Sequence, residues 1–353
     1  PPAPNAQKKP KTAVITGQGN MAIHLVGGSN SRMKEGWSRY LADILDEPMH
    51  NRSIGATSSI MGAVLLDVLD DIKSGDTLIW EYALNDSGHV RRGYPCETLL
   101  RFIEYTLREC ARRGIRFTAA IFTPKFHNKT PDAITLRTRA LALFASYGVD
   151  AFDVNESYCT RNNLQEFPDE LYSNPLHYVE NDDLMGFIAQ GVAALLPGKV
   201  PTDLEPIHVG SGEYRIERFQ KDEVFKNSII SLPVAKAPTH MAFTHAEGWN
   251  VLGLLVLTHP RGGAIEFTCG DSRLELSLTH AAKKFDKHLL KFISFERLLG
   301  APVACAPNAS VTITPITKPG TFLSEIGLRS DLGLPALDAH NGLIAGMILE
   351  RRD

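Results

Sequence analysis

MAIHLVGG (21–28) is an apolar segment that ends in two glycines and is followed at once by Ser29. Its composition is typical of a buried strand, and the glycines are typical of a tight turn. A serine on such a turn exposes its hydroxyl beside backbone N–H groups at a helix start, where developing negative charge is stabilised. The same serine also fits an ordinary helix N-cap, so this segment alone does not indicate a function.

The chain around this segment alternates apolar strands with amphipathic helices up to about Pro197. The expected strands are 21–28, 76–84, 115–124 and 149–154, and the expected helices are 31–45, 58–73, 96–114, 134–148 and 182–198. This alternation predicts a parallel sheet covered by helices on both faces. Sites in such sheets lie at the carboxyl ends of the strands, so the loops after the first two strands are expected at one rim.

Three further segments carry residues suited to chemistry, namely NRSIGATSSIMG (51–62), LIWEYALND (78–86) and SNPLHYVENDD (173–183). Gly55 precedes a helix start, where its N–H can approach a ligand. Asn85 is expected at the end of a strand, where its amide can donate to an oxyanion. His177 precedes a long helix and can act as a general base near neutral pH. Taken singly, each also fits a helix-entry loop, a turn or a lone histidine.

The four segments together resemble the SGNH/GDSL hydrolase superfamily, whose Ser, Gly, Asn and Asp-x-x-His blocks follow one another in this order. The resemblance covers about residues 20–197 and implies a flavodoxin-like α/β/α fold. It implies that Ser29 is the nucleophile and His177 the base. It also implies an oxyanion hole made by the Ser29 N–H, the Gly55 N–H and the Asn85 side chain. The strings GGSNSxxxxGW and WEYxxND are similar to those of SGNH-type proteins associated with bacterial surface polysaccharides.

Two residues depart from the family pattern. Gly28 stands where the family's Gly-Asp-Ser has its acid, and Asn174 stands where an acid precedes the histidine by three residues. An amide can fix the tautomer of His177, but it does not stabilise the imidazolium as a carboxylate does. Three explanations remain open: a Ser–His dyad helped by Asn174 or a backbone carbonyl, a degenerate site, or another acid that orients the ring, such as Asp169, Glu170 or Asp182.

The expected function is that of a serine esterase that removes O-acyl groups, such as O-acetyl, from a carbohydrate through a Ser–His acyl-enzyme. This chemistry needs no metal or organic cofactor. One alternative is a polysaccharide O-acetyltransferase that uses the same residues, and another is a non-catalytic glycan-binding protein on the same scaffold. Ser31 is a rival nucleophile, although its expected place inside a helix start favours a capping role.

The composition changes at the proline-rich segment PGKVPTDLEP (197–206), which reads as a linker. Strand-like segments follow at 249–259, 264–270, 272–280, 291–298, 310–317 and 342–352, and they predict a β-sandwich or jelly-roll-like unit. The expected organisation is a linker and first short segment at 1–19, an SGNH-type catalytic domain at 20–197, a linker at 198–206 and a β-rich accessory domain at 207–353.

The net charge, apolar runs and cysteine content of the 353-residue chain argue against several classes of protein. A net charge of -3 argues against a nucleic-acid binder. No apolar run is long enough to span a membrane, and no signal peptide is visible. The 5 cysteines include no CxxC pair and are expected to be unpaired, which favours the cytoplasm over secretion. The acyl group, the glycan and the oligomeric state are left open.

Overall fold

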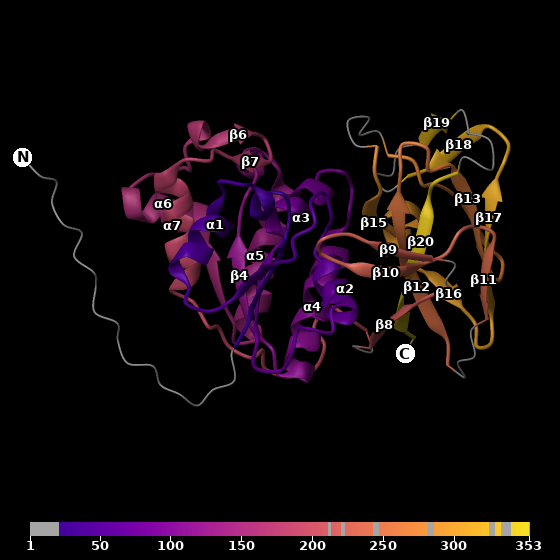
Figure 1. The fold of residues 1–353 in the computed structure, drawn as a ribbon, viewed down its shortest axis with the longest axis horizontal. Helices are drawn as coiled ribbons and strands as arrows, with labels where there is room; N and C mark the ends of the chain where they lie inside the picture. Colours follow the sequence, from indigo (N-terminus) through magenta and orange to yellow (C-terminus); the bar gives the residue numbers. More distant parts are fainter. Residues whose placement is uncertain are drawn as a thin grey trace, which may run out of the picture.

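The computed structural model describes residues 21–210, 213–219, 223–242, 247–280, 286–324, 329–332 and 340–352. The expected leading segment 1–19 lies outside these residues. Two parts of the chain lie side by side, one of helices and strands up to about residue 193 and one mainly of strands from about residue 214 (Figure 1). Within the described ranges, no helix is both long enough and apolar enough to span a membrane.

The first part is built on a parallel sheet of five strands in the order β2-β1-β3-β4-β5. The strands are β1 (Ile23–Gly27), β2 (Met49–Asn51), β3 (Thr77–Glu81), β4 (Arg116–Ile121) and β5 (Asp150–Asp153). This is the flavodoxin-like order, so the predicted fold is confirmed. The sequence did not reveal β2 because its three residues are partly or largely exposed and carry no apolar pattern.

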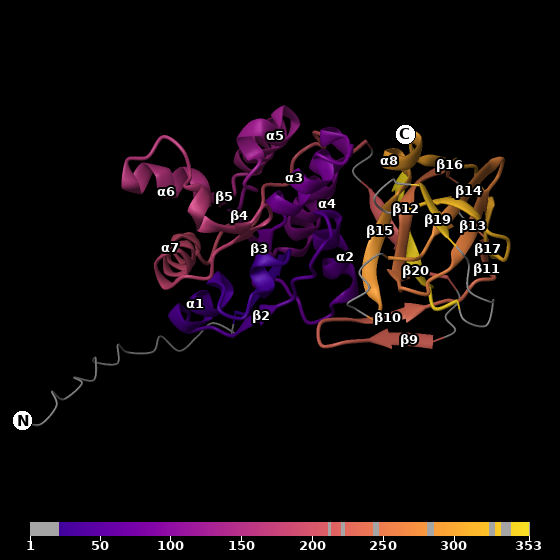
Figure 2. The ribbon, with the colours of Figure 1, turned by 90° about the horizontal axis from the view of Figure 1, so that it is seen from above.

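Helices cover both faces of this sheet (Figure 2). One face packs against α1 (Trp37–Ile44) and α7 (Asp182–Ala193), and the other against α2 (Ile60–Val68), α4 (Cys96–Arg113) and α5 (Pro131–Ser146). Helix α6 (Val154–Asn162) follows β5 directly. Alternate strand residues serve the two faces, since Leu25 joins the cluster of α1 and α7 whereas Val26 joins the cluster of α2 and α4.

Two elements at the carboxyl rim of the sheet differ from the expected ones. The expected helix 31–45 is a short 3-10 turn, η1 (Asn30–Arg32), followed by α1, because Gly36 is extended at the helix N-cap. The expected strand 76–84 ends at Glu81, and Asn85 lies in the first turn of α3 (Ala83–Val90) instead of at a strand end. The apolar run continues past the strand because Leu84 at the helix start is also buried.

The second part consists of two packed sheets and a hairpin. A six-stranded sheet has the order β11-β17-β13-β14-β18-β19, and its partner has the order β15-β12-β20-β8, with β16 also paired to β12. The expected sandwich-like β domain is therefore confirmed. Its elements are β8 (Tyr214–Glu217), β9 (Glu223–Lys226), β10 (Ser231–Val234), β11 (Thr239–Ala242), β12 (Trp249–Thr258), β13 (Ala264–Cys269), β14 (Ser272–Ser277), β15 (Leu289–Ser294), α8 (Phe295–Leu299), β16 (Val303–Cys305), β17 (Ser310–Ile316), β18 (Gly320–Leu323), β19 (Arg329–Leu332) and β20 (Leu343–Arg351).

The sheet that contains β12 is apolar on both faces. Val251 and Leu254 pack into the sandwich, whereas Leu252 and Leu255 belong to the same buried cluster as α2 and α4. The sheet lies directly beside these two helices (Figure 2). A strand that is buried on both faces needs a continuous apolar run, which explains the sequence WNVLGLLVLT of β12. The two domains therefore share one hydrophobic core.

Buried carboxylates also tie α4 to the second domain and to the segment that leads into it. Glu104 is fully buried and accepts hydrogen bonds from the backbone N–H groups of Ile207, His208 and Val209. The Tyr105 hydroxyl donates to Glu350 Oε1 at 2.6 Å. Separating the domains would therefore break these hydrogen bonds of Glu104 and Tyr105.

The expectation that the cysteines are unpaired is wrong for two of them. Cys269 at the end of β13 and Cys305 at the end of β16 form a disulfide that joins the two sheets of the sandwich. Cys96, Cys110 and Cys159 are free. The two paired residues lie 36 positions apart without a recognisable spacing motif, so the sequence alone could not pair them.

Substitution of Phe292 in β15 tests whether the two domains share a core. Its ring packs edge-on against Phe102 of α4, with 5.5 Å between the ring centroids. We expect Phe292→Ala to lower the free energy of unfolding by about 3–5 kcal/mol, the usual cost of deleting a buried aromatic ring. Chemical denaturation followed by both fluorescence and circular dichroism should show one transition for the two domains. Two separate transitions in the unmodified protein would contradict a common core.

Candidate active site

Ser29 lies at the carboxyl end of β1, on a turn that the neighbouring strand holds in place. The Gly28 N–H donates to the Glu81 backbone carbonyl at 3.0 Å and lies 3.1 Å from the Glu81 carboxylate. The Ser29 carbonyl accepts from the Arg32 N–H, which starts η1. Ser29 is partly exposed at the rim of the sheet, where the sequence predicted it.

The structure brings His177 to this serine from 148 positions away, with its Nε2 atom 2.7 Å from Ser29 Oγ. His177 lies in β7 (His177–Tyr178), which pairs with β6 (Tyr172–Asn174) in a small hairpin ahead of α7. This distance is a hydrogen bond in which the hydroxyl can donate to the ring. This is the geometry expected of a nucleophile beside a general base.

Asn174 faces the other ring nitrogen, with 3.0 Å between its Oδ1 atom and His177 Nδ1. The same oxygen accepts the backbone N–H of Leu176 at 3.0 Å, so the atom that faces the ring is the amide oxygen. His177 Nδ1 must then carry the hydrogen, and Nε2 is left free to accept the Ser29 proton. Burial lowers the pKa of His177 below its usual value, which keeps the ring neutral at neutral pH.

The other acids considered for orienting His177 are engaged elsewhere or exposed. Asp169 pairs with Lys125 at 3.2 Å, and Asp182 accepts from the Tyr40 hydroxyl at 2.5 Å. Glu170 is exposed in the short turn η3 (Asp169–Leu171). The structure therefore places Asn174 at the ring nitrogen distant from Ser29.

Gly55 and Asn85 both lie beside the nucleophile turn. A Cβ built on Gly55 would be 3.6 Å from Ser29 Cβ, so the Gly55 backbone borders the serine. A Cβ built on Gly28 would be 2.2 Å from Asn85 Oδ1, so the Asn85 amide rests on the turn itself. One Asn85 N–H donates to the Thr57 carbonyl at 2.8 Å, and the amide nitrogen has a second hydrogen for another acceptor.

Glu81 lies beneath the turn, and the sequence analysis did not single it out. Its Oε2 atom accepts the Ser31 hydroxyl at 2.6 Å, and the side chain is fully buried. Burial raises the pKa of Glu81 to about 8, against the smaller lowering effect of its hydrogen bonds to Ser31 and Gly28. Ser31 is also fully buried, so the rival nucleophile is not in a position to reach a substrate. The sequence feature that could have identified Glu81 is the presence of a glutamate within the otherwise apolar run LIWEY.

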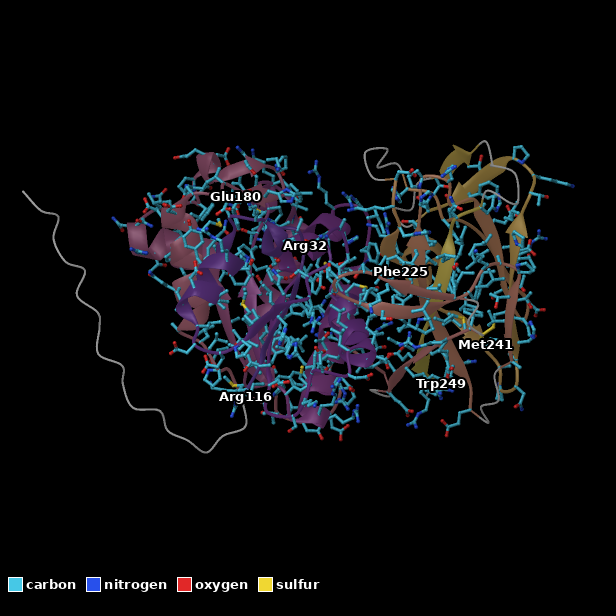
Figure 3. All side chains as sticks on the ribbon, viewed as in Figure 1. Arg32, Arg116, Glu180, Phe225, Met241 and Trp249 are labelled. Atoms are coloured by element: carbon cyan, nitrogen blue, oxygen red, sulfur yellow. A yellow bond between two sulfur atoms is a disulfide. The ribbon has the colours of Figure 1, made fainter. Side chains whose placement is uncertain are left out.

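Asn30 is a second residue that sequence reasoning missed. Its buried side chain donates to the Leu176 carbonyl at 2.9 Å and accepts the Tyr178 N–H at 3.2 Å. These two partners flank His177, so the residue after the nucleophile fixes the backbone on both sides of the base. Arg32, labelled in Figure 3, lies 3.9 Å from a Cβ built on Gly55 and adds a positive charge there.

An open cavity of about 890 Å³ lies along the carboxyl ends of β4 and β5, next to the hairpin that carries the histidine. Tyr172 of β6 and Phe167 line one part of it, and the remaining lining includes side chains with amide and charged groups, among them Lys125, Arg137 and Asn155. Polar groups beside aromatic rings suit a ligand with many hydroxyls. Among the described residues, no cluster of three or more His, Cys, Asp or Glu side chains is placed to hold a metal ion.

The fold is shared with solved structures along nearly the whole chain. A two-domain esterase (CEX) active on acetylated mannans is 11% identical, with a TM-score of 0.57 over 94% of this chain and 91% of that chain. The same esterase co-crystallised with mannopentaose is 12% identical, with a TM-score of 0.57 over 94% and 92%. A lipolytic G-D-S-L family member from Veillonella parvula is 14% identical and covers 50% of this chain and 100% of its own, with a TM-score of 0.41.

The chain has the fold of this two-domain esterase. Its second, β-rich domain is also present in the two-domain esterase. No protein-family model and no curated protein sequence matches the chain. The fold thus rests on topology and structural similarity, and the resemblance to the SGNH/GDSL superfamily rests on the order of the four sequence blocks.

A substitution at Gly28 tests whether the position of the Asn85 amide matters for the reactivity of Ser29. We expect Gly28→Ala to slow the reaction of Ser29 with a fluorophosphonate by roughly 10²-fold, because the new Cβ displaces the Asn85 amide from the turn. Gly88→Ala on α3 is the matched control, since its new Cβ would meet nothing closer than Leu176 Cδ2 at 3.9 Å. Equal labelling rates in the two variants would show that Asn85 does not act at this serine.

Because Asn174 carries an amide and no charge, we expect a particular pH dependence of Ser29 labelling. Ser29 labelling should rise with pH as His177 loses its proton, with a midpoint below about 6.5 because burial lowers the pKa of that ring. In Asn174→Asp, a carboxylate at this position favours the charged ring and should move the midpoint up by at least ~1 pH unit. Asn174→Ala serves as the control without a new charge. An unmoved midpoint in Asn174→Asp would mean that another group faces the ring.

Proposed function

We propose that this protein is a serine esterase that hydrolyses O-acyl groups, above all O-acetyl groups, on a carbohydrate. The observation that carries the proposal is the 2.7 Å contact between Ser29 Oγ and the unprotonated Nε2 of His177. Similarity in fold to an esterase active on acetylated mannans supports the carbohydrate class. The polar and aromatic cavity beside the hairpin of the histidine gives a glycan chain a place to lie.

The proposed reaction has two steps, acylation of Ser29 and hydrolysis of the acyl-enzyme. Ser29 Oγ attacks the ester carbonyl while its proton passes to His177 Nε2, which forms a tetrahedral oxyanion. The N–H groups of Ser29 and Gly55 and the free N–H of Asn85 stabilise that oxyanion. The imidazolium then protonates the departing sugar oxygen as the C–O bond breaks. Water, deprotonated by His177, attacks the acyl-enzyme and releases the carboxylic acid and the free serine.

Ser29→Ala tests the proposal directly. We expect it to lower kcat/KM for acetate release from an acetylated mannan by roughly 10⁴-fold or more, because the nucleophile is lost. A fluorophosphonate should label residue 29 in the unmodified protein, and mass spectrometry of the labelled peptide separates Ser29 from the buried Ser31. Acetate release that survives in both Ser29→Ala and His177→Ala would overturn the assignment.

The same assay distinguishes the other candidate functions. Net transfer of acetyl groups onto a glycan, without release to water, would replace the hydrolase by an O-acetyltransferase that uses the same residues. Glycan binding without acetate release and without labelling of Ser29 would indicate a binding protein on an SGNH scaffold.

A further inference from the structure

The loop that carries Gly55 has an unfavourable backbone conformation at the next residue. Ala56 has a φ of 56°, in the left-handed region that residues with a side chain rarely adopt. Such a conformation costs free energy and persists only where surrounding contacts hold it. The loop from Ile54 to Thr57 therefore needs partners, and these partners determine where the Gly55 N–H points.

Three carbonyl groups of this loop accept hydrogen bonds. The Thr57 hydroxyl donates to the Ile54 carbonyl at 2.7 Å, and that carbonyl shares a peptide plane with the Gly55 N–H. Asn85 donates to the Thr57 carbonyl at 2.8 Å. The carbonyl of Ala56, the left-handed residue itself, accepts from the Lys291 ammonium at 2.5 Å.

Lys291 belongs to β15 of the second domain and lies 235 positions from the loop. Only 6% of the residue is exposed, which is unusual for a lysine. A buried ammonium costs free energy unless acceptors satisfy it, and the Ala56 carbonyl is one such acceptor. The neighbouring His89 of α3 does not add a second positive charge, since burial first, and then Lys291 and nearby arginines, lower its pKa to about 3.

We infer that Lys291 is a positioning residue for the oxyanion hole, by which the second domain fixes the Ala56 carbonyl and thereby the direction of the Gly55 N–H. The inference rests on the proposed function, because Gly55 matters to the reaction only if an oxyanion forms beside Ser29. It assigns the β domain a part in the chemical step. No contact between this domain and the glycan is needed for that part.

A comparison of a variant of Lys291 with a variant of Arg218 tests the inference. Lys291→Met removes the ammonium but keeps an unbranched side chain. Arg218→Met is the matched control, because it deletes another interdomain contact, the ion pair with Asp67 of α2 at 2.6 Å, away from this loop. Lys291→Gln, whose polar group is one bond shorter than the lysine, carries the same expectation if the methionine variant does not fold.

We expect Lys291→Met to lower kcat roughly 10–100-fold with KM changed less than about twofold, since loss of an oxyanion donor outright costs about 10²–10³. Asn85→Ala provides that larger reference effect. Arg218→Met should lower the Tm but leave kcat within about twofold. The inference is overturned if the Lys291 and Arg218 variants lose the same small fraction of kcat at matched Tm.

A second measurement separates this inference from the proposed function. In a spectrum of the full chain labelled with ¹⁵N-glycine, Lys291→Met should shift the Gly55 amide resonance and speed its hydrogen exchange, whereas Arg218→Met should do neither. An unshifted Gly55 resonance in Lys291→Met overturns the inference even if the esterase is active. Loss of the proposed function would instead show as absent acetate release and absent Ser29 labelling in the unmodified protein.

Discussion

The side chain of Asn85 occupies the space that a Cβ on residue 28 would need, and much of the site depends on this contact. The Asn85 amide thus lies against the turn of Ser29, although Ser29 follows β1 and Asn85 belongs to α3. The other end of the amide holds the Thr57 carbonyl and hence the loop of Gly55. A side chain on residue 28 would therefore require the Asn85 side chain to move.

Spacing and residue type in the sequence were sufficient to predict the parallel fold, which the structure confirms, and to select Ser29, Gly55, Asn85 and His177, which the structure brings together. Their catalytic roles stay predictions. Glu81, Asn30 and Lys291 were missed because each acts on a residue at least 50 positions away, and no local pattern encodes such a contact. The predicted ends of helices and strands were wrong where buried apolar residues continue past the end of an element. The expected strand 291–298 stops at Ser294, whose hydroxyl caps α8, although the apolar pattern runs on through Phe295.

The groups around the nucleophile carry little negative charge. Asn174 takes the place of a carboxylate, and Glu81 is largely protonated at neutral pH because burial raises its pKa to about 8. A carboxylate near a developing oxyanion would oppose it, whereas an amide and a neutral acid do not. The same substitution removes the charge that would stabilise the imidazolium. In the proposed reaction, this distribution of charge would favour the oxyanion over the cation, and Arg32 beside Gly55 would act in the same direction.

The double-sided apolar sheet has a consequence for how the polypeptide is made. The first domain leaves the ribosome before β12, β15 and β20 exist, so the flank of α2 and α4 is exposed until the last residues of β20 are synthesised. An uncovered apolar surface of this kind invites association with other nascent chains. Removal of the β domain would therefore expose this apolar surface of the first domain. It completes the burial of the α2 and α4 flank in the domain that precedes it.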